Sequence, residues 1–289
     1  MKILVIGGTR FFGKELVSKL LKQGHDVTVL SRGNQALPHA DKISHIRADR
    51  DDFKDQLSDL GTHWDVVYDQ ICYCGNDAAA TLKAIKGKAD KLIIASTEAV
   101  YQNGSNMRET DFDPYSFSYE PGPRSHFSYA DGKRHAEAFL YQNSDIPVTA
   151  ARIPFVLGPD DYTNRLRQIV TAVARQTPIY VPSLKSGISM INAGDLANTL
   201  CALKEIDLNG PINIAPKAPI TIRALLNKIE NVVGKEALLT DSLSDQALSS
   251  DFFVNADRSI NPDYLTSFGF EIPAIDDWIG SLIKGVGIN

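Results

Sequence analysis

The stretch ILVIGGTRFFG, residues 3–13, joins a short apolar run to a glycine-rich turn. Such a run is typical of a buried strand, and residues 14–23 then carry apolar side chains at helical spacing. Gly7 permits a sharp turn, and Gly13 lets the helix pack closely on the strand. The amides at a helix start and the helix dipole both favour an anion. The stretch therefore predicts a strand–turn–helix unit that binds a pyrophosphate, the alternative being a merely tight turn.

The first half of the chain alternates between two hydrophobic periods. Runs that are apolar throughout predict strands at residues 26–30, 43–47, 66–70, 91–96 and 148–153. Apolar side chains at helical spacing predict helices at residues 52–60, 78–85 and 129–141. Fully apolar strands separated by helices are typical of parallel sheets covered on both faces. The expected fold class is therefore α/β, with a doubly wound parallel sheet.

After about residue 155 this alternation loosens. Helices are expected at residues 165–175 and 273–286. Two more are expected, one from an Asp195 cap to residue 203 and one that follows a Thr221 cap. A strand is expected at residues 188–193. We predict a dinucleotide-binding domain over residues 1–155, with the elements at 188–213 added to it. Residues 156–187 and 214–289 are predicted to form a smaller substrate lobe.

The composition restricts the class of protein. The 289 residues carry 30 Lys and Arg against 35 Asp and Glu, a net charge of −5, and 43% are hydrophobic. This mix excludes a disordered chain, and the scattered cations argue against nucleic acid as a partner. The apolar runs are far shorter than the ~20 residues of a membrane span. Cys72, Cys74 and Cys201 cannot all pair with one another, which suggests a reducing compartment, and we expect a cytoplasmic protein.

The end of the second strand usually selects the dinucleotide. An acidic residue there binds the ribose 2′-hydroxyl of NAD, whereas an Arg accommodates the 2′-phosphate of NADP. This chain has Ser31-Arg32 and no carboxylate at that position, and Arg10 can reach the same phosphate from the glycine loop. NADP is therefore favoured, with NAD left open. The alternative is that Arg32 is a solvated surface charge.

A proton-transfer pair is predicted at the start of a helix, in Tyr129-Ala-Asp-Gly-Lys133. Residues four apart share one helical face. A free phenol has a pKa of ~10, and a neighbouring ammonium favours its ionised form. Such a pair can pass a proton to or from a substrate oxygen. At the end of the fifth strand, Ser96 and Thr97 are candidates to polarise a carbonyl, and the register favours Thr97.

Taken in order, these motifs resemble those of a known superfamily. The glycine loop, the Ser/Thr-x-x-Val-Tyr strand end, Tyr-x-x-x-Lys followed by Glu137, and Arg152 before Gly158-Pro159 are similar to the extended short-chain dehydrogenases/reductases. The nearest branch is the NAD-dependent epimerase/dehydratase family, and GGTRFFG resembles a group that includes chloroplast stem-loop-binding proteins. The resemblance implies a Rossmann fold, an enzyme that transfers hydride between a nicotinamide cofactor and a small carbonyl or hydroxyl substrate, and a homodimer.

The resemblance also implies roles for individual residues. Thr97, Tyr129 and Lys133 match the catalytic positions, with Lys133 also on the nicotinamide ribose. Cofactor contacts are implied or expected at the following positions: Gly7, Thr9, Arg10, Phe11, Phe12, Gly13, Ser31, Arg32, Asp49, Arg50, Gln70, Ile71, Cys72, Tyr129, Lys133, Ile153 and Pro154. Glu98, His126 and Phe155 are candidate substrate contacts.

The departures from the family pattern concern the substrate. Phe155 stands where sugar-nucleotide epimerases carry Asn, and Glu98-Ala99 replaces the paired acids of the 4,6-dehydratases. These departures argue against a sugar nucleotide and favour a small carbonyl compound or an atypical substrate. The loop 102–127 has the length of a lid, although its aromatic residues could equally pack on the smaller lobe.

Three further expectations complete the sequence-based account. No metal site is expected, because Cys72-x-Cys74 lacks a second ligand pair. The homodimer is expected to pair the small apolar faces of residues 78–85 and 136–140. The alternative to an enzyme is a dinucleotide sensor or an RNA-binding protein without turnover.

Overall fold

The structure is a computed structural model that describes residues 1–37, 39–50, 57, 61–244 and 246–287. The chain forms two compact units. Unit 1 comprises Met1–Gln102, Arg108–Ile153 and Leu196–Ile214. Unit 2 comprises Asn103–Met107, Pro154–Asp195 and Ala215–Asn289.

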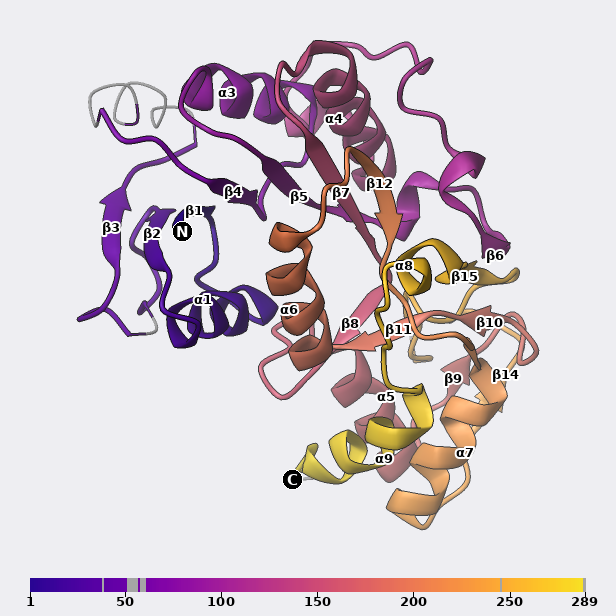
Figure 1. Ribbon diagram of the computed structural model, residues 1–289. Coiled ribbons are helices and arrows are strands. Elements are labelled where there is room, and N and C mark those ends of the chain that lie inside the picture. Colours follow the sequence, from indigo (N-terminus) through magenta and orange to yellow (C-terminus); the bar gives the residue numbers. More distant parts are fainter. Residues whose placement is uncertain (38, 51–56, 58–60, 245, 288–289) are drawn as a thin grey trace. The chain divides into compact units, whose positions relative to one another are not determined.

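The described part of unit 1 is built on a seven-stranded sheet (Figure 1). Its strands are β1 (Lys2–Ile6), β2 (Asp26–Ser31), β3 (Ser44–Arg47), β4 (Val66–Asp69), β5 (Leu92–Thr97), β7 (Val148–Ile153) and β12 (Gly210–Asn213). They lie in the order β12-β7-β5-β4-β1-β2-β3, and all neighbours are parallel. This confirms the doubly wound α/β fold. The order reverses at β1, so the segments after β1 and β4 border the crevice where such sheets bind ligands.

Helices cover both faces of this sheet (Figure 1). They are α1 (Phe12–Lys22), α3 (Gly75–Ile85), α4 (Tyr129–Asn143) and the later part of α6 (Ala193–Ala202), with the short 3-10 helices η1 (Glu98–Val100), η2 (Glu109–Asp111), η3 (Arg124–His126) and η4 (Leu203–Glu205). Leu4 and Ile94 share a core with α3 and α4. The Tyr68 hydroxyl donates to the Leu200 carbonyl of α6 at 3.0 Å on the other face. Adjacent strand residues point to opposite faces, and this alternation provides the two apolar layers.

Unit 2 combines short strands with helices. Its elements are β6 (Gly104–Met107), β8 (Phe155–Leu157), β9 (Ile179–Tyr180), β10 (Gly187–Ile188), β11 (Met190–Asn192), β13 (Ile220–Thr221), β14 (Leu239–Thr240), β15 (Arg258–Ile260), α5 (Arg165–Arg175), α7 (Ile222–Val233), α8 (Asp263–Ser267) and α9 (Ile275–Gly285). A four-stranded sheet has the order β13-β10-β15-β6, while β11 pairs with β8 and β14 with β9. The apolar faces of α5, α7 and α9 supply much of the core.

Several boundaries differ from those expected. The strand expected at residues 188–193 is divided, because β10 pairs in the four-stranded sheet and β11 pairs with β8. Helix α6 begins at Ala193, so Asp195 lies within its first turn and is not its cap. The Thr221 cap is confirmed, since its hydroxyl accepts from Ala224 N at 3.1 Å. The helix expected at residues 52–60 lies outside the described residues apart from Leu57. In the part of the chain described, no helix is long and apolar enough to cross a membrane.

The segment expected as a lid instead packs on α4. Tyr115 lies 4.9 Å from Tyr141 and Tyr119 lies 5.3 Å from Phe139, measured between ring centroids. The structure thus corrects both interpretations of the 102–127 loop, which also contains β6, η2 and η3. Ala136, a residue of the expected dimer face, is fully buried within this single chain. Of residues 136–140, only Phe139 is half-buried and is left for a dimer contact.

Candidate active site

The turn after β1 excludes side chains and leaves its backbone accessible. Gly7 and Gly8 have φ angles of +95° and +72°, a region that favours glycine. A Cβ atom at Gly8 would lie 2.8 Å from Val5 Cγ1, and one at Gly13 would lie 2.3 Å from Gln70 Oε1. Phe11 occupies the N-cap of α1, and its ring cannot accept the hydrogen bonds that a Ser or Asp would accept. This turn has the close backbone approach and the helix start that a pyrophosphate needs.

Gln70 follows β4 and lies against the same turn. Its Nε2 atom is buried and has no hydrogen-bond acceptor within the described part of the chain. Buried amide nitrogens are almost always bonded, so this donor suits a ligand oxygen. The glycine turn and Gln70 together therefore fit a dinucleotide. Of the other predicted turn residues, Thr9 and Phe12 are half-buried, while Arg10 is exposed.

The next residues take different positions from those expected. Ile71 borders the turn, since a Cβ atom at Gly7 would lie 3.2 Å from Ile71 Cγ2. The Cys72 side chain is fully buried in the core, and burial raises the pKa of its thiol well above the ordinary value. Only the backbone of Cys72 is left to line a cofactor path.

Arg50 has a different role from the cofactor contact expected of it. Its Nη2 donates to Asp69 Oδ1 and Oδ2 at 2.6 and 2.7 Å, and its Nη1 donates to Thr81 Oγ1 at 3.0 Å. Asp69 is fully buried and also accepts from Ile71 N at 3.0 Å. The guanidinium is therefore bound to protein groups, and it holds the start of the segment that contains Gln70 and Ile71.

Polar groups gather where β2 and β3 end. Ser31 Oγ lies 3.0 Å from His45 Nε2, and the Arg47 Nε donates to the Arg32 carbonyl at 3.1 Å. The Arg32 side chain is 67% exposed and lies 3.9 Å from an Asp49 carboxylate oxygen that is itself largely exposed. Arg32 and Asp49, two predicted adenosine-side contacts, are thus neighbours.

The two hydroxyl candidates on β5 are separated by the structure. Ser96 Oγ donates to the buried Glu137 carboxylate, so its hydroxyl serves the core. Thr97 points the other way and caps η1, with Oγ1 accepting from Ala99 N at 3.2 Å. Among the described residues, the structure gives no acceptor for the hydroxyl proton of Thr97. This arrangement supports the choice of Thr97 over Ser96.

Tyr129 and Lys133 lie in the first turns of α4 and differ in burial. Tyr129 is 51% exposed, whereas Lys133 is 2% exposed and donates to the Ala95 carbonyl of β5 at 2.5 Å. The Lys133 ammonium lies 5.9 Å from the Tyr129 ring centroid. An ammonium has three donors, so Lys133 can hold β5 and still bind another oxygen.

Tyr73, which no sequence motif marks, joins the two parts of the site. Its ring lies 6.4 Å from the Tyr129 ring, and the Lys133 ammonium lies 4.7 Å from its centroid. Gly132 permits this approach, since a Cβ atom there would lie 2.4 Å from the Tyr73 carbonyl oxygen. The four residues from Gln70 to Tyr73 therefore run from the glycine turn to the Tyr129–Lys133 pair. The available signal was the position of an aromatic residue directly after a predicted cofactor segment.

Arg134 is a second residue that the sequence analysis missed. Its Nε donates to the Val100 carbonyl at 2.7 Å, and its Nη1 lies 2.7 Å from Asp131 Oδ1. A hydrogen bond from Ser128 and the Arg134 charge hold the pKa of Asp131 below its usual value. Arg134 thus ties the start of α4 to η1, the turn that Thr97 caps.

The remaining predicted residues are dispersed. Ile153 ends β7 opposite Thr97, Glu98 is buried in η1, and His126 is exposed in η3. Pro154 and Phe155 belong to unit 2, where the Phe155 ring packs 4.8 Å from Phe252. Phe155 is 9% exposed and packs within that core, and its expected substrate contact stays a prediction.

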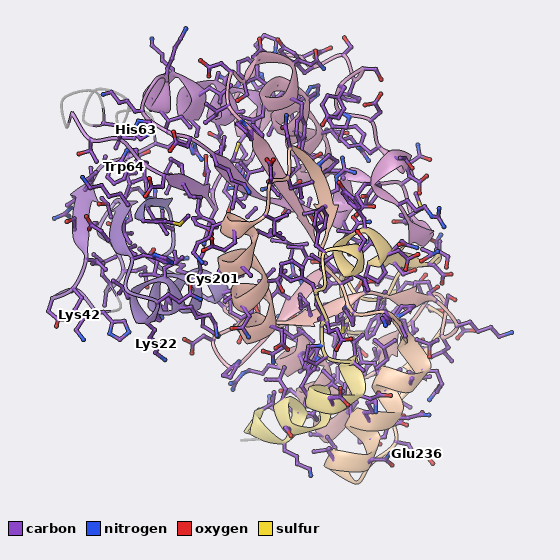
Figure 2. The ribbon with its side chains drawn as sticks, viewed as in Figure 1. Lys22, Lys42, His63, Trp64, Cys201 and Glu236 are labelled. Carbon is purple, nitrogen blue, oxygen red and sulfur yellow. The ribbon has the colours of Figure 1, made fainter. Side chains whose placement is uncertain are left out.

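The cysteines and histidines do not converge on a metal site. Among the residues described, no group of three or more His, Cys, Asp or Glu side chains is placed to hold a metal ion. His63 precedes β4, at the end remote from Cys72, beside Trp64 (Figure 2), and its Nε2 lies 2.7 Å from Asp90 Oδ1. Cys201, on α6 (Figure 2), is a free thiol, as are Cys72 and Cys74.

Comparison with known proteins identifies related sequences. The model of the NAD dependent epimerase/dehydratase family matches residues 3–215. The chloroplast stem-loop binding protein of 41 kDa b from Arabidopsis thaliana is 28% identical over 219 residues, 71% of this chain and 54% of that protein. UDP-glucuronic acid decarboxylase 1 from Xenopus tropicalis is 25% identical over 260 residues, 81% of this chain and 60% of that protein. The chain therefore spans between half and two thirds of the length of these relatives.

Solved structures share the fold over nearly the whole chain. UDP-glucose 4-epimerase of Thermus thermophilus, in complex with NAD, has a TM-score of 0.74 at 18% identity and covers 99% of both chains. UDP-glucuronic acid 4-epimerase of Bacillus cereus, with UDP-glucuronic acid and NAD, has a TM-score of 0.74 at 21% identity and covers 99% of both chains. At these identities the likeness shows the fold.

Proposed function

Because the chain belongs to the NAD dependent epimerase/dehydratase family, we propose that it is a nicotinamide-dependent oxidoreductase or epimerase acting on a carbonyl or hydroxyl substrate. The observation that carries this proposal is the segment from Gln70 to Tyr73. It borders the glycine turn at one end and the Tyr129–Lys133 pair at the other. A phosphate-binding turn and a proton-transfer pair that share one short segment suit a dinucleotide enzyme better than either feature alone.

When bound, the dinucleotide supplies the hydride acceptor or donor. We assign one role to each of three side chains. The exposed Tyr129 hydroxyl passes a proton to or from the substrate oxygen. Thr97 donates its hydroxyl proton to the same oxygen and polarises it. Lys133, held by Ala95, directs its remaining donors to the nicotinamide ribose.

The decisive variant is Tyr129→Phe. It keeps the ring at a half-exposed position, so the fold and dinucleotide affinity should be unchanged. Loss of a general acid–base should lower kcat by about 10²- to 10⁴-fold. Tyr264→Phe, at a similarly exposed tyrosine of unit 2, is the matched control. Full turnover by Tyr129→Phe would refute the proton-transfer role.

Dinucleotide binding without turnover would instead indicate a sensor. The required measurement is a substrate screen with wild-type protein and both dinucleotides, followed by absorbance of the reduced nicotinamide. Tight binding combined with no turnover across carbonyl compounds and sugar nucleotides would favour that alternative. The Tyr129–Lys133 pair argues against it, because a sensor has no chemical need for such a pair.

We propose NADP as the preferred dinucleotide. Arg32 is largely exposed at the end of β2, Arg10 lies on the glycine turn, and the end of β2 carries no carboxylate, a pattern that favours a 2′-phosphate. The related solved structures contain NAD, so the preference must be measured. Calorimetric titration with both dinucleotides should give tighter binding of NADP, and Arg32→Gln should remove the difference. A preference of the wild-type protein for NAD would overturn this proposal.

Most of the relatives support a small molecule as the substrate. Three of the four compared are named for UDP-glucuronic acid or UDP-glucose chemistry, and the fourth is named for stem-loop binding. We propose a substrate of this general kind, a carbonyl or hydroxyl compound small enough to reach the exposed Tyr129 hydroxyl. The substrate screen described above tests this, and turnover confined to compounds without a carbonyl or hydroxyl group would contradict it.

We also propose a homodimer, through the half-buried residues of the two faces first expected, residues 78–85 and 136–140. Ala136 is buried in the single chain, so a dimer would have to use outward-facing residues of α3 and α4, such as the half-buried Leu82 and Phe139. Sedimentation should give twice the mass of the chain. A mass near 31.7 kDa would contradict the dimer.

We further propose that RNA is not the main ligand and that the protein lies in the cytoplasm. The net charge of −5 argues against RNA as the main ligand, and a salt titration would test this, because phosphate contacts weaken steeply with salt. Tight binding of a stem-loop RNA with a steep salt dependence would contradict us. The buried free thiols of Cys72, Cys74 and Cys201 support a reducing compartment, and we propose the cytoplasm. Fractionation of cells that produce the protein would test that location.

A further inference from the structure

Arg124 has no role in the site described so far, and it lies against Tyr73, the tyrosine that neighbours the Tyr129–Lys133 pair. The Arg124 guanidinium lies 4.1 Å from the centroid of the Tyr73 ring, which also neighbours Tyr129 and Lys133. Within the described residues, the structure gives this guanidinium neither a hydrogen bond nor an ion pair with a carboxylate. Stacking on an aromatic face uses the plane of a guanidinium and leaves the N–H donors at its edge accessible.

The loop that carries Arg124 is anchored to both neighbouring helices. Glu120 N donates to His135 Nδ1 of α4 at 2.9 Å, and Gly122 N donates to Asn76 Oδ1 of α3 at 3.0 Å. The Phe127 ring lies 4.4 Å from the His135 ring. Arg124 therefore projects from a loop held on either side of it, so a ligand need not order the loop on binding.

We propose that Arg124, stacked on Tyr73, anchors an anionic group of the substrate, either a carboxylate or a phosphate. This rests on the proposed function, and it narrows the substrate class to molecules that carry such a group near the reacting carbon. Arginine binds both groups through paired N–H donors. The dinucleotide pyrophosphate has its own site at the glycine turn, which leaves Arg124 for the substrate.

Matched pairs of ligands test the proposal directly. The pairs are UDP-glucuronic acid with UDP-glucose, glucuronate with glucose, and glucose 6-phosphate with glucose. Each is titrated by calorimetry into protein saturated with the dinucleotide that binds more tightly. We expect the anionic member of at least one pair to bind about 10- to 100-fold more tightly. The pair that shows the preference distinguishes a carboxylate from a phosphate.

Variants test whether the preference for the anionic ligand depends on the stacking of Arg124 on Tyr73. Arg124→Gln should remove the difference within the pair, and Arg124→Lys should retain part of it. Tyr73→Phe keeps the ring and should keep the preference, whereas Tyr73→Leu should reduce it. Lys86→Gln removes one positive charge from an exposed site at the end of α3 and should have no effect. Because Arg124 is exposed, Arg124→Gln should melt at the wild-type temperature.

Several outcomes would overturn the proposal. These are equal binding within every pair, no binding of any anionic member, a preference that survives Arg124→Gln, or an equal loss of dinucleotide affinity in that variant. The last outcome would place Arg124 on the cofactor. Failure of the proposed function is distinguishable, since it would appear as no dinucleotide binding or as full turnover by Tyr129→Phe.

Discussion

Two arginines of unit 1, one fully buried and one largely buried, each lie against a fully buried carboxylate, and they serve different parts of the site. Arg152, on β7, has no exposed side-chain surface and lies 2.7 Å from Glu137. Arg50 follows β3, retains 11% exposure and lies 2.6 Å from Asp69. Both charges raise the same physical problem, because a buried ion needs a partner for every donor and acceptor.

In the first group, which we call the Arg152 centre, Arg152 and Glu137 are bonded to each other and to neighbouring polar groups. Its Nε and Nη2 donate to Glu137, and its remaining donors bond the Tyr101 hydroxyl at 2.9 Å and the Glu109 and Phe112 carbonyls at 2.8 and 3.1 Å. All five guanidinium donors thus have acceptors. These partners come from α4 and from the segment after β5, so the centre fixes the elements that carry Tyr129 and Thr97.

The Arg50 centre is smaller and nearer to solvent. Its partners Asp69, Asp77 and Thr81 come from the end of β4 and from α3. It holds the segment that runs from Gln70 to Tyr73. The comparison teaches that one buried pair supports the proton-transfer helix and the other supports the cofactor segment, and four variants examine that division.

The largest effect is expected for Arg152→Met. It leaves the Glu137 carboxylate buried without its cation, which should lower the free energy of unfolding by about 3–5 kcal/mol. Urea unfolding followed by circular dichroism measures this. The double variant Arg152→Met/Glu137→Leu, which removes both charges, should recover much of the loss. A loss of under about 1 kcal/mol in the single variant would contradict the importance of the pair.

Arg50→Met should cost less stability, about 2–3 kcal/mol. Asp69 keeps its hydrogen bonds from Thr81 and Ile71 N, and the Arg50 site is nearer to water. This variant should also weaken dinucleotide binding in calorimetry, because the segment after β4 loses its support. An unchanged dinucleotide affinity would show that the segment does not depend on Arg50.

Tyr101→Phe tests the hydroxyl of the first centre. That hydroxyl donates to Asn213 Oδ1 at 2.7 Å and accepts from Arg152, so its loss should cost about 1–2 kcal/mol at neutral pH. Burial raises the pKa of Tyr101 above the ordinary value, even though the Arg152 charge opposes this. The unfolded chain therefore releases the phenol proton at lower pH than the folded chain, and stability falls as the pH rises above ~10.

The fall in the free energy of unfolding at alkaline pH provides the control for Tyr101→Phe. Unfolding free energies measured between pH 9 and 11, a range chosen to bracket the ~10 of a free phenol, should fall less steeply for Tyr101→Phe than for the wild type. Tyr68 and Tyr141, whose pKa values burial also raises, should maintain part of the decline in both proteins. Parallel curves would mean that Tyr101 does not contribute.

The smallest effect is expected for Thr81→Val. The Thr81 hydroxyl donates to Asp69 Oδ2 at 2.6 Å, and valine keeps the shape of the side chain while removing that bond. Asp69 still accepts from Arg50, so the loss should be about 1 kcal/mol by urea unfolding. A loss as large as that of Arg50→Met would mean that the hydroxyl and the guanidinium contribute equally.

Local patterns predicted much of unit 1. The apolar runs located its strands, and the bounds of β7 agree with those expected, as do the bounds of α5 in unit 2. The glycine spacing identified the turn after β1. These features depend on neighbours within a few residues, which a sequence shows directly.

The sequence did not predict the surroundings of side chains that long-range contacts decide. Cys72 and Phe155 were expected at ligands but pack in cores, and Arg50 was expected on the cofactor but binds Asp69. No local pattern marks these outcomes, because each depends on side chains from other elements. The same reason explains why Tyr73 and Arg124, 51 positions apart by their residue numbers, were missed.

The sequence by itself determined the succession of strands and helices along the chain, the turn that suits a pyrophosphate, and the helical face shared by Tyr129 and Lys133. These follow from backbone sterics and from periodicities of a few residues. Only the tertiary structure decided which hydroxyl of β5 is available, which arginines are bound in buried pairs, and that Arg124 stacks on Tyr73. Such choices depend on burial and on distances between remote segments, and a chain acquires both only when it folds.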